Sequence, residues 1–331
     1  MNFSQSKVTI LTEAGKSIGF GHYTRCIALF DELVINGFDV QFIVHENFIN
    51  INDERHVKLN WKEEVDAISP RSESDILIVD SYLASNEILS KLYNKFYSLF
   101  IIDDYNRIEY PAEYIINPNV FFDSIDYSNQ SGKCVGGKDF VILRKEFRTS
   151  KSFFSESSLK LNILVSVGGS DYRNLLQKIV ITLDEVSNIE FEVVVIDPEG
   201  KLDIKSEQEL NYFKTQTSIE MVGHMQKADL VISACGQTLH ELASLAKPTI
   251  GICIDFDQIL NQEFYYKRGF LKSLISWDDK DFSQKIKDNI SYFSISENRK
   301  KIKQISNSII NVDGVKKIVE LIENKNNAFT Q

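Results

Sequence analysis

Apolar residues in the first half of the chain gather in short runs that are separated by longer amphipathic stretches. Aliphatic runs with little polar alternation indicate parallel strands that are buried on both faces of a sheet. Such runs predict strands at Val8–Leu11, Val40–Val44, Ile76–Val79, Leu99–Ile102 and Tyr114–Ile116. Apolar positions at helical spacing predict helices over His22–Asn36 and Ser85–Tyr97.

The alternation stops and then restarts near the middle of the chain. Residues 121–137 lack periodicity and are rich in Ser, Asp, Asn and Gly, so we expect a long loop there. Ser150–Ser158 contains five serines, and we place the domain boundary in this segment. Beyond it, strands are predicted at Leu161–Ser166, Phe191–Ile196, Leu230–Ser233 and Thr249–Ile254. Helices are predicted from near Asp171 or Tyr172, over Gly236–Leu245 and Gln258–Arg268, and over most of Ser283–Lys325.

Strand–helix alternation in both halves predicts the α/β fold class, with helices on both faces of a parallel sheet. The 331 residues are too many for one ordinary core and suit two domains of roughly 150 residues each. We therefore expect two Rossmann-like domains that face each other across a cleft, the first over residues 1–150 and the second over 151–331.

The amino-acid composition and the net charge limit the kinds of molecule that the protein can bind. Apolar residues make up 43% and charged residues 25% of the chain, which is typical of a globular protein. The net charge of −10 argues against a nucleic-acid partner, because binding a duplex requires a basic face. A small anionic ligand is still compatible with it, since a helix N-terminus can supply enough donors for one phosphate group.

The four cysteines Cys26, Cys134, Cys235 and Cys253 form no C-x-x-C pair and no Cys/His cluster, so we expect reduced thiols, no metal and no cofactor. The first five residues lack the pattern of a signal peptide, and no apolar run is long enough to span a membrane. We expect a cytoplasmic protein, with a monomer as the default.

A glycine-rich loop follows the first predicted strand. Gly15, Gly19 and Gly21 let the backbone pass close to a ligand, and His22 stands at the start of the next helix. The positive end of that helix favours a neutral imidazole that can act as a base. The alternative is a helix-capping histidine. Thr24 stands where a dinucleotide fingerprint needs its third glycine, which counts against a dehydrogenase.

Polar residues also follow two later strands, in Asp80-Ser81-Tyr82 and Asp103-Asp104-Tyr105. Ligands bind beyond the carboxyl ends of the strands in open parallel sheets. A carboxylate there can fix a base or bind a sugar hydroxyl. The alternative is helix capping, which we favour for Asp104 and leave open for Asp80 and Tyr82.

In the second half, Ser233–Thr238 joins a strand to a helix through small residues, which suits a diphosphate bound to backbone N–H groups. Glu241, one turn into the helix, can accept hydrogen bonds from a ribose diol or can be an ordinary solvated residue. Gly168–Asp171 is a similar but less specific loop.

Several short motifs occur together between about residues 8 and 270. They are Ile18–Cys26, Asp80–Tyr82, Ile102–Asp104, Ile116–Asn119, Leu143–Phe147, Val167–Asp171, Gly236–Glu241 and Asn261-Gln262. As a set and in this order, they resemble the UDP-2,4-diacetamido-2,4,6-trideoxy-β-L-altropyranose hydrolases of pseudaminic acid biosynthesis. That family is related to glycosyltransferases of the spore-coat-polysaccharide type and has the GT-B fold.

The resemblance implies that the second domain binds UDP and that the first domain binds the sugar, with His22 next to the anomeric carbon and no metal. Residues implied to bind the substrate are Gly19, Gly21, Arg25, Asp80, Tyr82, Asn119, Gly169, Ser170, Gly236, Gln237, Thr238, Glu241, Asn261 and Gln262. The chain departs from the family at Thr12-Glu13-Ala14, where an Asp-containing stretch is expected, and in residues 121–137. These departures leave the exact sugar open.

We therefore predict hydrolysis of a UDP-linked diacetamido-trideoxyhexose at its anomeric carbon, with His22 as the general base on water. A GT-B glycosyltransferase that moves the sugar to a glycan or lipid acceptor is the first alternative. The second is a nucleotide-sugar-binding protein without catalytic activity. A non-hydrolysing 2-epimerase ranks lower, since no pair of carboxylates is placed as firmly as His22.

Overall fold

A computed structural model describes the chain as two compact units. It covers residues 7–15, 18–47, 51, 53–150, 160–169, 171, 173–198, 200, 202, 210–214 and 217–329, without the side chains of residues 47 and 329. The first unit comprises residues 1–145 and 311–331, and the second comprises residues 146–310.

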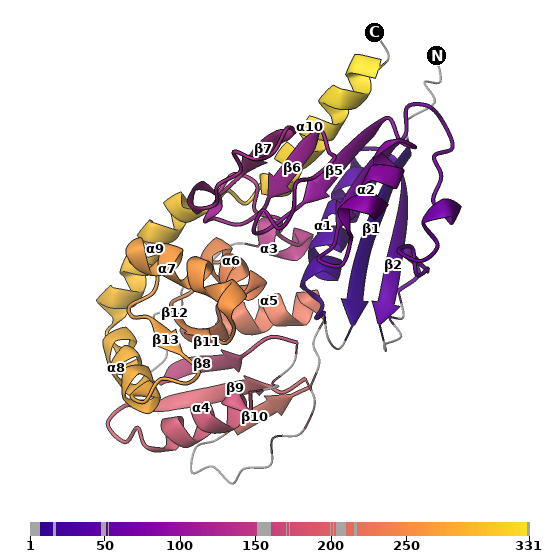
Figure 1. Cartoon of the computed structure of the whole chain (residues 1–331). Coiled ribbons are helices and arrows are strands. Elements are labelled where there is room, and N and C mark those ends of the chain that lie inside the picture. The colour runs from indigo at the N-terminus through magenta and orange to yellow at the C-terminus, as the bar shows by residue number, and fades with distance from the viewer. Residues whose placement is uncertain are drawn as a thin grey trace. The chain divides into compact units, whose positions relative to one another are not determined.

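The first unit is built on a parallel sheet (Figure 1). The order of its strands is β3-β2-β1-β4-β5-β6-β7. The strands are β1 (Lys7–Gly15), β2 (Asp39–Asn47), β3 (His56–Lys58), β4 (Ile76–Asp80), β5 (Ser98–Ile102), β6 (Tyr114–Asn117) and β7 (Lys133–Gly136). Its helices are α1 (Gly21–Ile35), α2 (Asn86–Tyr93) and α10 (Gly314–Phe329), with short 3-10 turns η1 (Val65–Ala67) and η2 (Phe122–Ser124). Every residue of β1, β4 and β5 is buried, as expected for strands covered on both faces.

The second unit is built on another parallel sheet, with the order β10-β9-β8-β11-β12-β13. Its strands are β8 (Leu161–Ser166), β9 (Phe191–Ile196), β10 (Leu210–Phe213), β11 (Leu230–Ala234), β12 (Thr249–Cys253) and β13 (Ile275–Ser276). The helices that follow the boundary are α3 (Lys145–Thr149), α4 (Leu175–Asp184), α5 (Ser218–Lys227), α6 (Gln237–Ser244), η3 (Phe256–Gln258), α7 (Ile259–Lys267), α8 (Phe282–Ser294) and α9 (Ser296–Ile309). The prediction of an α/β fold with two parallel sheets is therefore confirmed.

The segment 121–137 differs from the long loop that we expected, because it contains η2 and the edge strand β7. β7 pairs in parallel with β6 through backbone groups, while its own side chains are half-buried or exposed. Asp103 orders the chain around it by accepting hydrogen bonds from the hydroxyls of Tyr110 and Tyr127. The strand carries no apolar run, so the sequence pattern does not reveal it.

The predicted second domain also needs a correction at its end. We assigned residues 151–331 to it, but residues 311–331 belong to the first unit. Four residues of α10 are buried in the core that α1, β1 and β4 share, and they are Val315, Ile318, Val319 and Ile322. The apolar stripe of a helix shows that it packs on something, but it does not identify the core.

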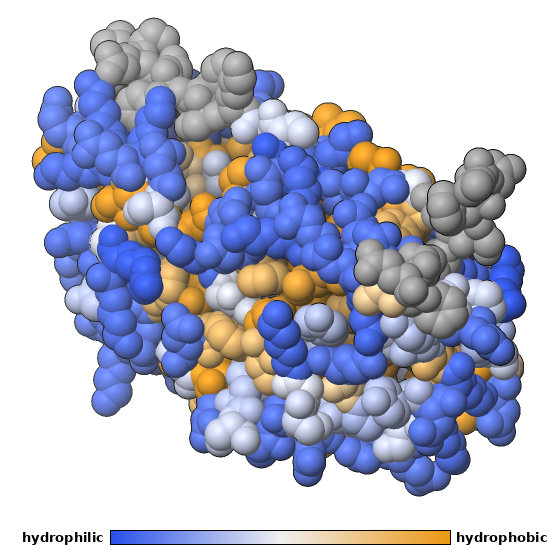
Figure 2. Space-filling view, turned by 90° about the horizontal axis from the view of Figure 1, so that it is seen from above, coloured by the Kyte–Doolittle hydropathy of each residue, from blue (hydrophilic) through white to orange (hydrophobic). Residues whose placement is uncertain are grey.

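Hydrophilic residues cover most of the face shown in Figure 2, with hydrophobic residues exposed in patches between them. The described residues with exposed apolar side chains include Phe20, Leu83 and Phe256. Among the described helices, none combines the length and the apolar character that crossing a bilayer requires.

Candidate active site

Each sheet reverses its strand order at one point, and most of the predicted site residues follow the strands at these points. In the first sheet the reversal lies between β1 and β4, which pair in parallel. In the second it lies between β8 and β11. Ligands of open α/β sheets bind in the crevice outside the carboxyl ends of the two strands at such a point. Each unit therefore has one expected ligand-binding edge.

A tight turn at the end of β1 places His22 at this edge. Gly15 and Gly19 form an isolated bridge, with the Gly19 N–H donating to the Gly15 carbonyl at 2.7 Å. Gly19 has a φ of +81°, a conformation that favours glycine. Helix α1 then starts at Gly21, so that His22 lies in its first turn and is almost fully buried.

The imidazole of His22 is held by a buried carboxylate from the end of β4. Its Nδ1 lies 2.6 Å from Oδ1 of Asp80, whose side chain is fully buried. Nη2 of Arg25, which can only donate, lies 3.1 Å from the same Nδ1. The ionised carboxylate, which can only accept, is nearer, so we assign the imidazole proton to Nδ1. The lone pair of Nε2 is then available to take a proton from another group.

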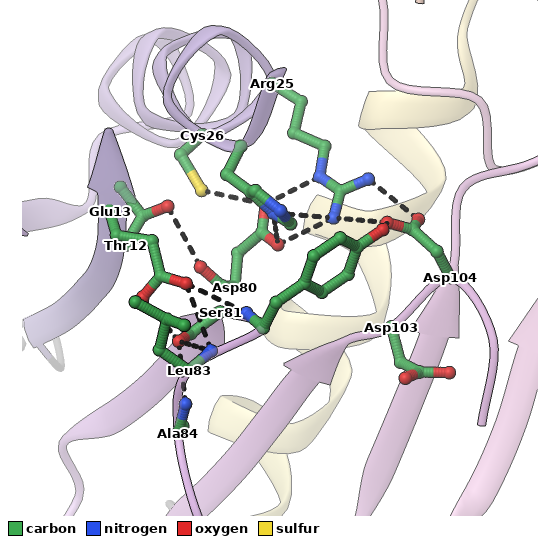
Figure 3. Close-up of polar contacts among 12 residues, drawn as sticks. Thr12, Glu13, Arg25, Cys26, Asp80, Ser81, Leu83, Ala84, Asp103 and Asp104 are labelled. Carbon is green, nitrogen blue, oxygen red and sulfur yellow. Dashed lines mark hydrogen bonds and ion pairs between the residues drawn. The ribbon is translucent and has the colours of Figure 1, made fainter. Parts of the chain in front are cut away.

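Arg25, one turn later in α1, joins this carboxylate to a second one (Figure 3). Its Nε and Nη2 each donate to Asp80 at 2.6 Å, and its Nη1 donates to Asp104 at 2.8 Å. Burial alone would raise the pKa of Asp80, but the charge of Arg25, with hydrogen bonds from Arg25 and His22, holds that pKa below its usual range. The guanidinium that the resemblance assigns to the substrate is thus engaged with the protein's own carboxylates.

Tyr82 and Asn119 complete the cluster around Asp104. The Tyr82 hydroxyl and the Asn119 amide each donate to this carboxylate at 2.5 Å. The ring of Tyr82 also meets the His22 imidazole edge to face, with centroids 4.3 Å apart. Burial and the neighbouring Asp104 raise the pKa of the Tyr82 hydroxyl well above its ordinary value, so Tyr82 is a hydrogen-bond donor here and not a base.

The fold thus brings the predicted residues of the first half together at one sheet edge. Our helix-capping interpretation of Asp104 is wrong, because no helix begins between β5 and β6 and its carboxylate binds Arg25, Tyr82 and Asn119. The sequence signal for its role was its place after the apolar run Leu99–Ile102.

In the second unit, the predicted diphosphate loop runs from β11 into α6. Gly236 is the N-cap of α6, and Gln237 and Thr238 form its first turn. The first N–H groups of a helix have no partner within the helix, so this end is suited to an anion. Sequence reasoning missed Gln258, whose Oε1 accepts from the backbone N–H groups of Cys235 and Ile254 at 3.1 and 3.3 Å. Its side chain thus joins the residues that directly follow β11 and β12.

The remaining predicted residues of this unit differ in their surroundings. Gly169 follows β8, and Ser170 lies outside the described residues. Glu241 is buried in α6, so our alternative of a solvated helix residue is wrong. Asn261 donates to the Cys235 carbonyl, while its buried Oδ1 has no hydrogen-bond partner in the described part of the chain. Gln262 donates to the carbonyls of Gly251 and Ile275, which makes its amide a brace between strands.

A model of the family described as "Glycosyltransferase family 28 C-terminal domain" matches residues 134–303, just over half of the chain. The spore coat polysaccharide biosynthesis protein SpsG of Bacillus subtilis is 24% identical over 77% of this chain and 78% of its own length. The Helicobacter pylori protein named "Pseudaminic acid cytidylyltransferase and UDP-2,4-diacetamido-2,4,6-trideoxy-beta-L-altropyranose hydrolase" is 22% identical over 80% of this chain. The match covers 48% of that longer protein.

Solved structures match the chain over nearly its whole length. The UDP-GlcNAc 2-epimerase of Neisseria meningitidis, solved with UDP-GlcNAc, has a TM-score of 0.61 at 13% identity. That match covers 96% of this chain and 100% of the epimerase chain. At this identity the likeness shows the fold alone, and it confirms the GT-B fold expected from the sequence.

Proposed function

The chain belongs to the family of the glycosyltransferase family 28 C-terminal domain, and on that premise we propose that it hydrolyses a UDP-linked sugar. The substrate class is a UDP-linked diacetamido-trideoxyhexose, the class in the name of the Helicobacter pylori relative. Water replaces UDP at the anomeric carbon, and the products are UDP and the free sugar.

The observation that carries this proposal is the contact between His22 Nδ1 and Asp80 Oδ1 at the β1/β4 edge. When the Nδ1–H of the imidazole donates a hydrogen bond to Asp80, the lone pair of Nε2 can act as a general base. Asp80 fixes this tautomer and stabilises the imidazolium that forms when Nε2 accepts a proton. Arg25 keeps Asp80 ionised for this task.

The chemical step follows from these roles. As the bond from the anomeric carbon to the phosphate oxygen breaks, the water oxygen forms its bond from the opposite face, and the water proton passes to His22 Nε2. The bonding electrons leave with UDP. Backbone N–H groups at the start of α6, with the helix dipole, suit the charge that develops on the phosphates. Direct displacement of this kind inverts the anomeric configuration.

The test is to incubate the protein with UDP-diacetamido-trideoxyhexoses, without any acceptor, and to follow UDP release. We expect release with the wild type and a loss of about 10²–10⁴-fold in His22→Ala, the usual contribution of a general base. His56→Gln is a matched control, because His56 is also paired with a buried carboxylate, Glu46 of the neighbouring strand β2. An unchanged rate in His22→Ala excludes His22 as the base.

Transfer of the sugar to an acceptor is the second candidate, and it is the reaction that the description of the matching family names. In that reaction His22 deprotonates an acceptor hydroxyl in place of water. Strict dependence of UDP release on a second sugar or a lipid would replace the hydrolase proposal by this one. Thermal stabilisation by the UDP-sugar with no release under either condition would indicate a binding protein.

A further inference from the structure

We propose that Glu13 is a positioning residue for the His22 site and acts through the turn 81–84 and Tyr82. The inference rests on the proposed function, since His22 is the base of that reaction. Glu13 lies near the end of β1, and its side chain is fully buried. A buried carboxylate is costly unless hydrogen bonds satisfy its oxygens, so its partners show which structure it stabilises.

The hydrogen bonds that the Glu13 carboxylate accepts from the described residues come from the turn that follows β4 (Figure 3). Its Oε1 accepts the backbone N–H groups of Tyr82 and Leu83 at 2.9 and 3.2 Å. Its Oε2 accepts the hydroxyl of Ser81 at 2.5 Å. Lys62 Nζ lies 3.8 Å from Oε2 and offsets part of the negative charge. One side chain from β1 thus holds three successive residues of the turn.

The Ser81 hydroxyl explains why a carboxylate is required at position 13. Its oxygen already accepts the N–H groups of Leu83 and Ala84, each at 3.0 Å. Both of its lone pairs are therefore used, and its own proton needs an acceptor. In Glu13→Gln the amide –NH₂ meets a donor in either orientation, because one side faces the Ser81 hydroxyl and the other faces the N–H groups of Tyr82 and Leu83. The substitution therefore keeps the side-chain volume and disturbs the turn.

The position of the turn determines where the Tyr82 ring lies against His22. Arg107 also contacts the turn. The centre of its guanidinium lies 5.7 Å from the centroid of the Tyr82 ring, and its Nη2 donates to the Ser81 carbonyl. The edge-to-face contact of Tyr82 with His22 and its hydrogen bond to Asp104 both depend on where the turn holds the ring. A shift of the turn therefore moves the groups around the base without removing any of them.

The first experiment compares UDP release by wild type, Glu13→Gln and Ser81→Ala. Misplacement near a reacting centre costs up to about 10²-fold in rate, so we expect kcat to fall roughly 10–10²-fold in Glu13→Gln while KM stays within about twofold. Ser81→Ala should lower kcat in the same direction. Glu46→Gln is the matched control, a buried carboxylate on β2 that binds His56 and Lys58 at the same sheet edge. An equal fall in kcat in the control overturns the proposal.

A double-mutant cycle separates positioning from mere stability. If Glu13 acts through Tyr82, Glu13→Gln should change kcat by less than about twofold when Tyr82 is already Ala, because interacting residues are not additive. Full additivity of the two effects on kcat would mean that Glu13 does not act through Tyr82.

A measurement that needs no activity keeps this inference distinct from the proposed function. The ring current of Tyr82 shifts the NMR resonance of the His22 imidazole proton on Cε1, which is assigned by its loss in His22→Gln. We expect this resonance to move in Glu13→Gln and in Ser81→Ala, and to stay in place in Glu46→Gln. A protein that releases no UDP but shows these shifts refutes the hydrolase and supports the positioning role. An unmoved resonance in both folded variants overturns the positioning role, whatever the activity.

Discussion

Arg25 is the residue on which the buried charges of the first unit depend. Its guanidinium donates to Asp80 and Asp104, and all three side chains are at most 9% exposed. Burial alone would lower the pKa of Arg25, but the charges of Asp104 and Asp80 raise it well above its usual value. The charge of one buried guanidinium thus compensates the charges of two buried carboxylates.

Replacing this cation leaves both carboxylates buried without compensation. We expect Arg25→Met to lower the free energy of unfolding by about 3–5 kcal/mol, the usual cost of breaking a buried ion pair from one side. Arg55→Met is the control, because Arg55 pairs with Asp31 and Asp53 while its side chain is 41% exposed. Exposed pairs contribute about 0–1 kcal/mol. Urea denaturation measures both, and equal losses would contradict the role given to Arg25.

Asp80 tests the tautomer of His22 directly. In Asp80→Asn the amide –NH₂ can face Nδ1, which favours the tautomer with its proton on Nε2 and removes the lone pair that the reaction needs. We expect a fall of about 10²–10⁴-fold in the rate of UDP release. The rate is normalised to the folded fraction from near-UV circular dichroism. A change of less than about threefold would show that Asp80 does not orient the base.

The sequence places the site residues at strand ends, but it does not give their partners. Asp80 and Tyr82 belong to a tripeptide that directly follows an apolar run, and His22 follows the glycine-rich loop after the first run, so these positions made them candidates. The role of Asp104 was not predicted, because its contacts with Arg25 and Tyr82 require β5 to lie beside β4, and the sequence pattern does not give the strand order. Gln262 was assigned to the substrate, yet its Nε2 donates to two backbone carbonyls that only the folded second sheet brings together.

At the scale of elements, the central strands were predictable and the edge strands were not. β1, β4, β5, β8 and β11 read as apolar runs because helices cover both faces of the sheet there. β3, β7 and β10 lie at or near sheet edges and carry mostly exposed or half-buried residues. Backbone pairing forms these strands, and backbone groups are the same in every sequence.

The predicted start of α4 lies a few residues before the observed one. We expected this helix from Asp171 or Tyr172, and it begins at Leu175. The carboxylate of Asp171 accepts the N–H groups of Leu175 and Leu176 at 2.7 and 3.0 Å, so it satisfies the first turn from outside the helix.

Lys247 connects α5 to the strand β12 and makes stability depend on pH. It donates to the carbonyls of Gln226 and Ala228, and burial lowers its pKa to about 8. An unfolded lysine keeps its proton up to a pH of about 10.4. Between these values the unfolded state binds more protons, so the free energy of unfolding should rise with pH by about 1–3 kcal/mol from this group.

The measurement is the difference in the free energy of unfolding between wild type and Lys247→Met from pH 8 to pH 10.5. Tyrosine titration affects both proteins and cancels in the difference. The free energy of unfolding of the wild type, relative to that of Lys247→Met, should increase as the pH rises. A difference that is constant or falls with pH would show that Lys247 keeps an ordinary pKa.

At the scale of the molecule, the first unit is discontinuous along the chain. The chain leaves the second unit at Ile310, and α10 packs in the core of the first unit (Figure 1). Polar contacts hold the return, with Asn311 donating to the Lys138 carbonyl and Lys317 paired with Asp139. The two units therefore have cores that can be destabilised separately.

Ile318→Ala should destabilise the first unit by about 2–5 kcal/mol, the usual cost of this truncation in a core. Hydrogen exchange should then accelerate in β1, β4 and α1 and keep its wild-type rate in β8 and β11. Ile302→Ala in α9, which is buried in the second unit, should give the opposite pattern. Acceleration spread equally over both units in either variant would contradict two separate cores.

The return of α10 has a consequence for synthesis on the ribosome. Residues 314–329 emerge only after the whole of the second unit, although the strands that they cover emerge first. Domains usually fold in the order in which they are made. Here the apolar residues of the first unit that pack on α10 lack this helix during the translation of residues 146–310, so the first unit is completed after the second has emerged.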